Sequence, residues 1–95
     1  MVRMEAAIGR RQFKPEVLSS LERESKACAL AIEYYQEMRE GLEKKYEISS
    51  DEFRKRFEEG SMGDEQDFFD WYAYNRFIDS WQQTKEALEE LIKWQ

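Results

Sequence analysis

Pro15 is the only proline in this chain of 95 residues, and Gly41 is the only glycine between it and Tyr46. Proline is tolerated in the first turn of a helix and disrupts later turns, so the sequence predicts a helix over about 15–47. Apolar side chains follow at helical spacing and form one stripe roughly 45 Å long. The stripe consists of Val17, Leu21, Cys28, Ala31, Ile32, Tyr35, Met38, Leu42 and Tyr46. This predicted helix covers about a third of the chain, and the expected fold class is all-α.

A second, short helix is predicted over about 50–59. Ser49 and Glu52 have the spacing of a capping box, in which each side chain accepts a hydrogen bond from the other residue's backbone N–H. Phe53 and Phe57 follow four residues apart and share one helix face. Gly60 is placed to end this helix in a left-handed conformation.

A third helix is predicted over about 64–93, with Asp64 as its N-cap. Its main apolar face lies in one wide arc, made of Trp71, Tyr74, Phe77, Ile78, Trp81, Leu88, Leu91 and Ile92. Asn75 falls on the opposite, polar side. Phe68, Phe69 and Tyr72 also project on that side, so something other than the main helix seam must cover them.

Two long helices separated by a compact insert favour a long antiparallel helical hairpin with a short intervening helix. Because such a hairpin leaves half of each apolar arc exposed, we expect two copies to pair into a four-helix bundle. The residues expected in this core or dimer seam are Tyr35, Trp71, Tyr74, Phe77, Trp81 and Leu88. A three-helix monomer is the alternative.

Composition excludes several classes of site. Apolar residues make up 41% of the chain and aromatic residues 15%, too many for a disordered segment. There is no histidine, which removes the commonest general base and metal ligand. We therefore expect no catalytic residues, no metal and no cofactor. Cys28, the single cysteine, is expected to be buried and inert.

The charge of −6 is unevenly distributed. The basic side chains of residues 1–14 are Arg3, Arg10, Arg11 and Lys14, and this segment is expected to be a flexible arm or a short strand. The remainder, residues 15–95, is an acidic helical domain that favours a basic protein partner and makes nucleic acid an unlikely one. No apolar run approaches the roughly 20 residues that span a bilayer, so we expect no membrane contact and a cytoplasmic location.

The segment GDEQDFFDWYAY contains the main candidate site. Asp64, Asp67 and Asp70 recur every third residue, and three interpretations stay open. The carboxylates could complement the helix dipole and cap its free N–H groups, contact a basic partner, or bind a metal, for which they converge poorly. The rings of Phe68, Phe69 and Tyr72 are either covered by Phe53, Phe57 and Met62 of the second helix region or form an exposed interface.

The stretch KKYEISSDEFRKRFEEGSMGDEQDFFDW carries a recognisable order of residues. They are Lys45, Tyr46, Ser49, Glu52, Phe53, Arg56, Phe57, Glu58, Gly60, Gly63, Asp64, Asp67, Phe68 and Trp71. This order resembles a family of small prokaryotic proteins, antitoxin-like or uncharacterised, whose genes often lie beside a toxin gene. Glu47 departs from the glycine or asparagine that such proteins usually have after the tyrosine.

The resemblance implies a protein-binding module that docks on a basic toxin and neutralises it, and that is oligomeric. The expected docking residues are Asp64, Asp67, Phe68, Phe69, Asp70 and Tyr72. The alternative function is a homo-oligomeric structural or assembly domain, whose aromatic surface is its own interface.

Overall fold

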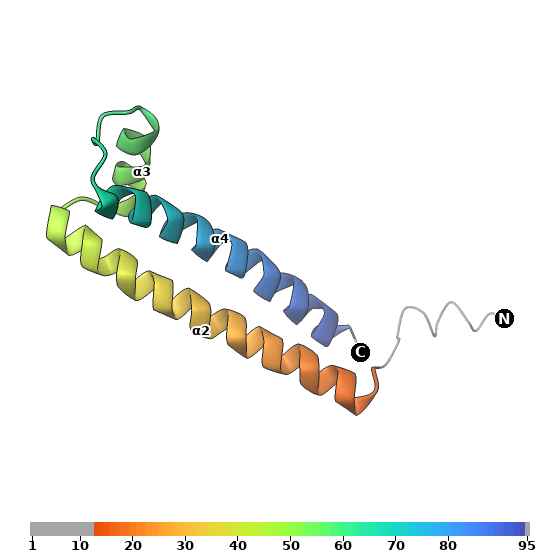
Figure 1. Ribbon diagram of the computed structural model, residues 1–95. Coiled ribbons are helices and arrows are strands. Elements are labelled where there is room, and N and C mark those ends of the chain that lie inside the picture. Colours follow the sequence, from red (N-terminus) through yellow and green to blue (C-terminus); the bar gives the residue numbers. More distant parts are fainter. Residues whose placement is uncertain (1–12, 95) are drawn as a thin grey trace.

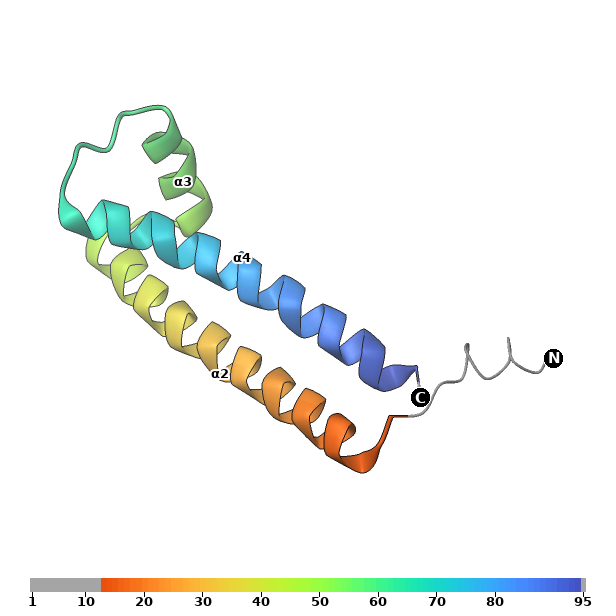
Figure 2. The same cartoon turned by 45° about the vertical axis from the view of Figure 1, so that its right-hand side comes forward.

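The computed structural model describes residues 13–94, which form three helices and no strand. Helix α2 spans Pro15–Tyr46, α3 spans Ser50–Glu58 and α4 spans Gln66–Lys93. The two long helices lie side by side and run in opposite directions, as the two views in Figures 1 and 2 agree. The predicted antiparallel hairpin with a short intervening helix is therefore confirmed. Almost all of the predicted basic arm lies outside the described residues.

Helix α2 begins with a proline in its first turn and ends at a residue with a left-handed backbone. Pro15 occupies its first turn after the extended Lys14, whose carbonyl accepts a hydrogen bond from the Leu18 N–H at 2.9 Å. At the other end Glu47 adopts a left-handed conformation with φ 59°, and its N–H donates to the Glu43 carbonyl at 2.8 Å. The left-handed residue turns the chain sharply into α3.

Helix α3 is held at both ends by hydrogen bonds that the sequence predicted in part. The Ser49 Oγ accepts from the Glu52 N–H at 3.1 Å, as a capping serine does. The Glu52 carboxylate binds Arg56 Nε at 2.8 Å. At the C-terminal end Gly60 has φ 79°, and its N–H donates to the Phe57 carbonyl, while the Ser61 N–H donates to the Arg56 carbonyl. These two bonds form a Schellman motif, so the predicted glycine stop is confirmed.

Helix α4 starts two residues later than predicted. Its N-cap is Glu65, not Asp64, and no side chain caps it. Gly63, with φ 87°, turns the chain, which then runs extended through Glu65 before the helix begins. The Glu65 carboxylate accepts a 3.5 Å hydrogen bond from the Tyr46 hydroxyl on the neighbouring helix. The prediction that Asp64 caps this helix is therefore wrong.

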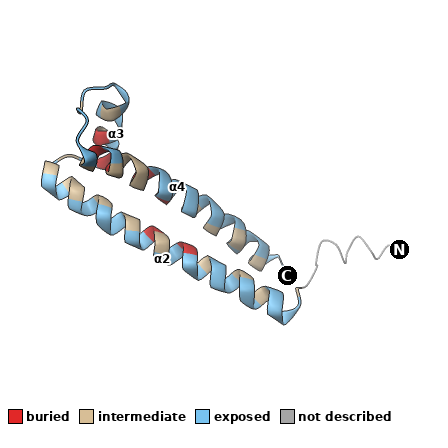
Figure 3. Cartoon of the chain, viewed as in Figure 1, coloured by how far each residue is buried: buried red, intermediate tan, exposed pale blue. Residues whose placement is uncertain are grey.

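The hairpin buries few side chains for its length (Figure 3). Cys28, Ile32 and Ile78 are buried between α2 and α4, together with the polar Asn75. A second buried cluster, Phe53, Phe68 and Trp71, lies at the end of the hairpin where α3 packs. Helix α3 covers only that end, so the single chain is a hairpin of two long helices capped at one end.

Candidate functional site

The end of the hairpin under α3 is a cluster of stacked aromatic rings, which we call the aromatic cap. Its centre is Phe53, Phe68 and Trp71, and Leu42, Tyr46, Ile48, Phe57, Met62 and Tyr72 pack around it. Phe53 and Trp71 are both completely buried, with ring centroids 4.1 Å apart and planes at 1°. The indole Nε1 of Trp71 donates a 2.9 Å hydrogen bond to the Oγ of Ser50, so the polar edge of the ring is satisfied.

Trp71, predicted in the core seam, is buried and contacts Tyr46 of α2 with ring centroids 6.1 Å apart. The sequence did not predict its stack on Phe53 of α3. An arc calculated from spacing describes one helix alone and cannot include the short helix that packs across its first turns. Residues 68 and 71 are three positions apart and share the surface that α3 covers.

The three rings predicted to need a partner have different fates. Phe68 is buried in the aromatic cap, so it is not available to a docking partner. Tyr72 is half-buried, stacks on Phe57 at 4.7 Å and donates a hydrogen bond to Glu58 at 3.3 Å. Phe69 keeps 48% of its surface exposed, although its ring meets that of Phe57 edge-on at 5.6 Å. Of the two interpretations, coverage by α3 therefore applies to Phe68 and Tyr72, and exposure applies to Phe69.

Asp67 ties the two long helices together beside the aromatic cap. Its Oδ2 accepts hydrogen bonds from Lys45 Nζ at 2.7 Å and from the Tyr46 hydroxyl at 2.6 Å. These bonds, from Lys45 first and then Tyr46, lower the pKa of the Asp67 carboxyl. The same hydrogen bonds raise the pKa of Lys45 and that of Tyr46. Asp67 is thus occupied within the chain, which argues for a structural role.

The other two aspartates do not join it in a site. Asp64 is exposed and precedes the helix, and Asp70 accepts a 2.9 Å hydrogen bond from Gln66. Within residues 13–94 no group of three acidic or cysteine side chains is arranged to hold a metal ion. The metal interpretation of the repeated aspartates thus has no support from the geometry of the described residues.

The seam between the long helices differs from the predicted one in a polar residue. Tyr35 packs against Tyr74 and Phe77, with centroids 5.8 Å and 5.1 Å apart, as residues of one seam should. Asn75, predicted on the polar side, is buried against α2 and accepts a 3.5 Å hydrogen bond from Arg39 Nη1. The Nε of Arg39 is buried without a hydrogen-bond partner. The contact line of α4 therefore passes through Asn75 as well as the predicted Ile78, while Phe77 and Trp81 of the predicted seam keep 43% and 37% of their surface exposed.

Large apolar side chains of both long helices stay exposed. We call this set the apolar face, and its members are Val17, Leu30, Tyr34 and Met38 of α2 with Phe77, Trp81 and Leu91 of α4. Each keeps between 37% (Trp81) and 66% (Leu30) of its surface exposed. Tyr35 connects the two halves, because Tyr34 meets its ring edge-on at 5.1 Å and Phe77 packs on it from α4. Leu88, also predicted in the seam, is half-buried beside this face.

A groove continues the apolar face towards the aromatic cap. It is lined by Glu37, Met38, Gly41, Leu42 and Lys45 of α2 and by Asp67, Asp70 and Tyr74 of α4. A Cβ atom added to Gly41 would meet no other atom within 4 Å, so the space above this glycine is open. Burial, followed by the nearby Asp70 charge, raises the pKa of Tyr74.

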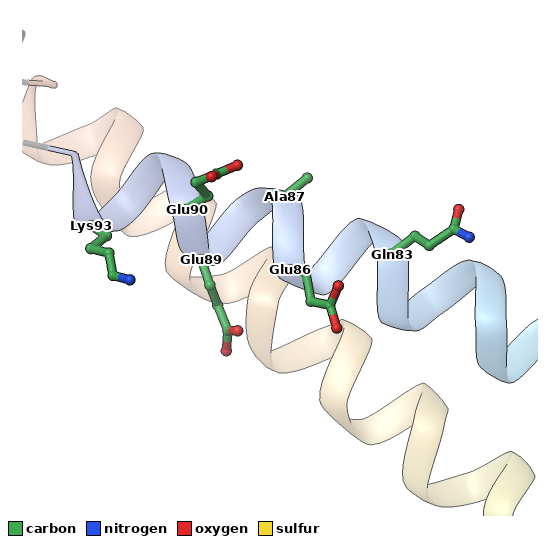
Figure 4. A pocket seen from close by; sticks show the side chains of 6 residues that line it. All are labelled: Gln83, Glu86, Ala87, Glu89, Glu90 and Lys93. Carbon is green, nitrogen blue, oxygen red and sulfur yellow. The ribbon is translucent and has the colours of Figure 1, made fainter. Parts of the chain in front are cut away.

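A larger hollow on α4 has no site character. It is lined by Gln83, Glu86, Ala87, Glu89, Glu90 and Lys93, all from one helix. Figure 4 shows that Gln83, Ala87 and Glu90 project on one side of the helix and Glu86, Glu89 and Lys93 on the other. Their polar groups therefore do not converge on a common point.

Cys28 lies in the seam, buried almost completely between the long helices. Burial, followed by the charge of Glu24, raises the pKa of its thiol. A buried thiol with a raised pKa is a poor nucleophile, in keeping with the predicted inert residue.

Sequence reasoning missed four residues that shape these surfaces: Ser50, Arg39, Asn75 and Gly41. Ser50 and Arg39 act through contacts with residues more than twenty positions away, which leave no local signal. Gly41 was noted in the sequence only as the single glycine of the predicted first helix. Its position on the exposed side could have been found by placing it on the same helical arc as Tyr34 and Met38.

Comparisons with models of protein families, with curated proteins and with solved structures found no match to this chain. The resemblance to antitoxin-like proteins therefore stays a prediction. No helix among the described residues is both long and apolar enough to cross a membrane.

Proposed function

We propose that this protein is an assembly domain, in which the apolar face of the hairpin packs against the same face of a second copy. The observation that carries this proposal is the extent of the apolar face. A large side chain has about 150–250 Å² of surface, so the exposed fractions of the face correspond to roughly 600 Å² per chain. This area is at the upper limit of the exposed apolar patches found on monomeric proteins. It is close to the roughly 800 Å² that each partner of a stable complex buries.

The charge distribution favours a second copy as the occupant of this face. Charged residues make up 38% of the chain, yet the α4 positions at seam spacing between Asp70 and the C-terminus are Tyr74, Phe77, Trp81, Thr84, Leu88 and Leu91. This stripe of α4 has no charge of its own to attract a basic protein, and it complements another uncharged apolar surface. Two such hairpins would complete a four-helix bundle.

Sedimentation equilibrium tests the proposal directly. At tens of micromolar we expect a mass of about twice 11.6 kDa, and a thermal midpoint that rises with protein concentration. Trp81→Glu places a charge in the face and should give the monomer mass with retained helical circular dichroism. Gln83→Glu adds the same charge on another side of α4 and should leave the dimer intact. A wild-type chain that sediments as a monomer at these concentrations contradicts the proposal.

Antitoxin-like docking on a basic partner is the second candidate function, and the exposure of Phe69 favours it. Phe69 is the one ring around the aromatic cap that keeps about half of its surface exposed. It lies on a chain with a net charge of −6, which attracts a basic protein. Tyr72 is a poorer probe of docking than the sequence suggested, because it also supports Phe57 and Glu58.

Co-expression with the product of the neighbouring gene tests this second function. If that product is toxic, the wild-type chain should relieve the toxicity and Phe69→Glu should not. Trp81→Glu, which disrupts the proposed dimer and leaves Phe69 in place, shows whether relief of toxicity requires dimerisation. Full relief by Phe69→Glu would remove Phe69 from the docking surface.

A further inference from the structure

We propose that the groove beside Gly41 is the binding site for the C-terminal part of α4 from a second copy, so that the two hairpins pair with their α3 ends at opposite ends of the dimer. This inference rests on the proposed assembly function and adds the arrangement of the two copies. Its ligand is the apolar pair Leu88 and Leu91, of which Leu91 is an exposed member of the apolar face.

Gly41 provides the first step. A glycine within a helix costs about 1 kcal/mol relative to alanine, and crowding within the chain does not account for it, because the space above it is open. The groove around it is lined by the apolar parts of Met38, Leu42 and Tyr74. A missing side chain on an exposed apolar surface is the hole that a partner's side chain fills when helices pack closely.

The spacing along α4 provides the second step. Tyr74 and Leu88 each lie seven residues from Trp81, a rise of about 10 Å in either direction. A two-fold axis that crosses the face beside Trp81 therefore brings Leu88 of one copy level with Tyr74 of the other. The same axis brings Leu91 level with the groove, and the two Trp81 rings meet at the centre of the interface.

Charge selects this arrangement over the one with both α3 ends together. The groove has three carboxylates, Glu37, Asp67 and Asp70, and only Lys45 as a cation. Pairing groove against groove would bring like charges together and leave two glycines facing each other over a void. Pairing groove against Leu88 and Leu91 fills the hole with apolar side chains and reduces the repulsion, because the carboxylates beside these leucines are accompanied by Lys85, which pairs with Glu89, and by Lys93.

Cross-linking tests the arrangement. Gly41→Cys and Leu91→Cys are made as separate chains and treated with a short bis-maleimide, and Cys28, being buried, serves as an unreactive background in the wild-type control. We expect covalent dimers when the two variants are mixed and none from either variant alone. Dimers formed by either variant alone would place equivalent residues together and overturn the proposal, and so would the absence of dimers in the mixture.

Filling the hole is the second test. Gly41→Gln introduces a good helix former into open space, so helicity should be kept or increased while the dimer dissociation constant rises at least tenfold. Ser19→Gln places the same side chain on an exposed position of α2 outside the groove and should leave the constant unchanged. An unchanged constant in Gly41→Gln overturns the groove as the site. A dimer that survives this change but dissociates in Trp81→Glu would keep the proposed function and refute only this arrangement.

Discussion

The ring of Phe53 lies flat on the ring of Trp71, with 4.1 Å between centroids and 1° between planes, and both side chains are completely buried. This contact joins a helix of nine residues to one of 28. Helices as short as α3 are unstable alone in water, so α3 depends on this stack for its existence. The aromatic cap is therefore what holds α3 against the end of the hairpin.

Phe53→Ala should destabilise the chain by about 3–5 kcal/mol, the usual cost of removing a fully buried phenylalanine. Urea unfolding followed by circular dichroism measures the change. Phe69→Ala removes the same side chain from a half-exposed position and should cost about 1 kcal/mol or less. Equal losses in the two variants would show that α3 does not hold Phe53 against Trp71.

Ser50→Ala should cost about 1–3 kcal/mol, because it leaves the buried indole N–H of Trp71 without an acceptor. The double variant Ser50→Ala with Trp71→Phe removes both partners. Its loss should be smaller than the sum of the two single losses, which a double-mutant cycle measures. Additive losses would mean that the hydrogen bond contributes nothing to stability.

Most of the fold could be predicted from signals that lie close together in the sequence. Pro15 marked the start of α2, Ser49 the start of α3 and Gly60 its end, because each acts on the backbone within a few residues. Helical periodicity of the apolar residues then required two long helices. The prediction of Asp64 as the N-cap was wrong because the extended residue before the helix is Glu65. Sequence patterns do not locate a helix end to within one residue.

The environment of each ring in the candidate site could not be predicted in the same way. The stack of Trp71 under α3 was not predicted, and the burial of Phe68 was one of two interpretations left open, because the turn at Glu47 and the loop through Gly63 help to determine where α3 lies. Asn75 was predicted on the exposed, polar side of α4 because the spacing of residues within one helix gives no information about Arg39 on the neighbouring helix α2. Both errors arise from contacts between segments distant in sequence.

Glu47→Gly should stabilise the chain by about 0.5–1 kcal/mol. Glu47 has a left-handed backbone, which costs an ordinary residue about 1–2 kcal/mol, while glycine adopts it freely and loses part of the gain through its flexible unfolded state. Gly60→Ala is the opposite control. Gly60 has φ 79°, so an alanine there should lower the free energy of unfolding by about 1 kcal/mol. Denaturant midpoints measure both, and a destabilised Glu47→Gly variant would contradict the argument.

Asp67 should make stability depend on pH in the acid range. Its pKa is lowered in the folded chain, so its contribution is complete above the unfolded value of about 3.9 and is lost as pH falls through the lower folded value. Asp67→Asn should therefore have a lower urea midpoint than wild type at pH 7, with the difference disappearing in strong acid. Asp64→Asn is the control, because Asp64 is exposed outside α4 and should behave as wild type. A difference that persists unchanged at low pH would show that the charge of Asp67 is not what matters.

Arg39 and Asn75 form a part-buried polar contact between α2 and α4 that we expect to lower stability. Their hydrogen bond is long at 3.5 Å, and the Arg39 Nε is buried without a partner. Replacing both by apolar residues, as in Arg39→Met with Asn75→Leu, should raise the free energy of unfolding by about 1–3 kcal/mol, since an unsatisfied buried group is removed. Asn75→Leu alone should gain less stability or lose some, because it removes the hydrogen-bond acceptor of the Arg39 guanidinium group. The four chains of a double-mutant cycle, compared by urea unfolding, measure this coupling. A loss of stability in the double variant would mean that the polar pair supports the alignment of α2 and α4.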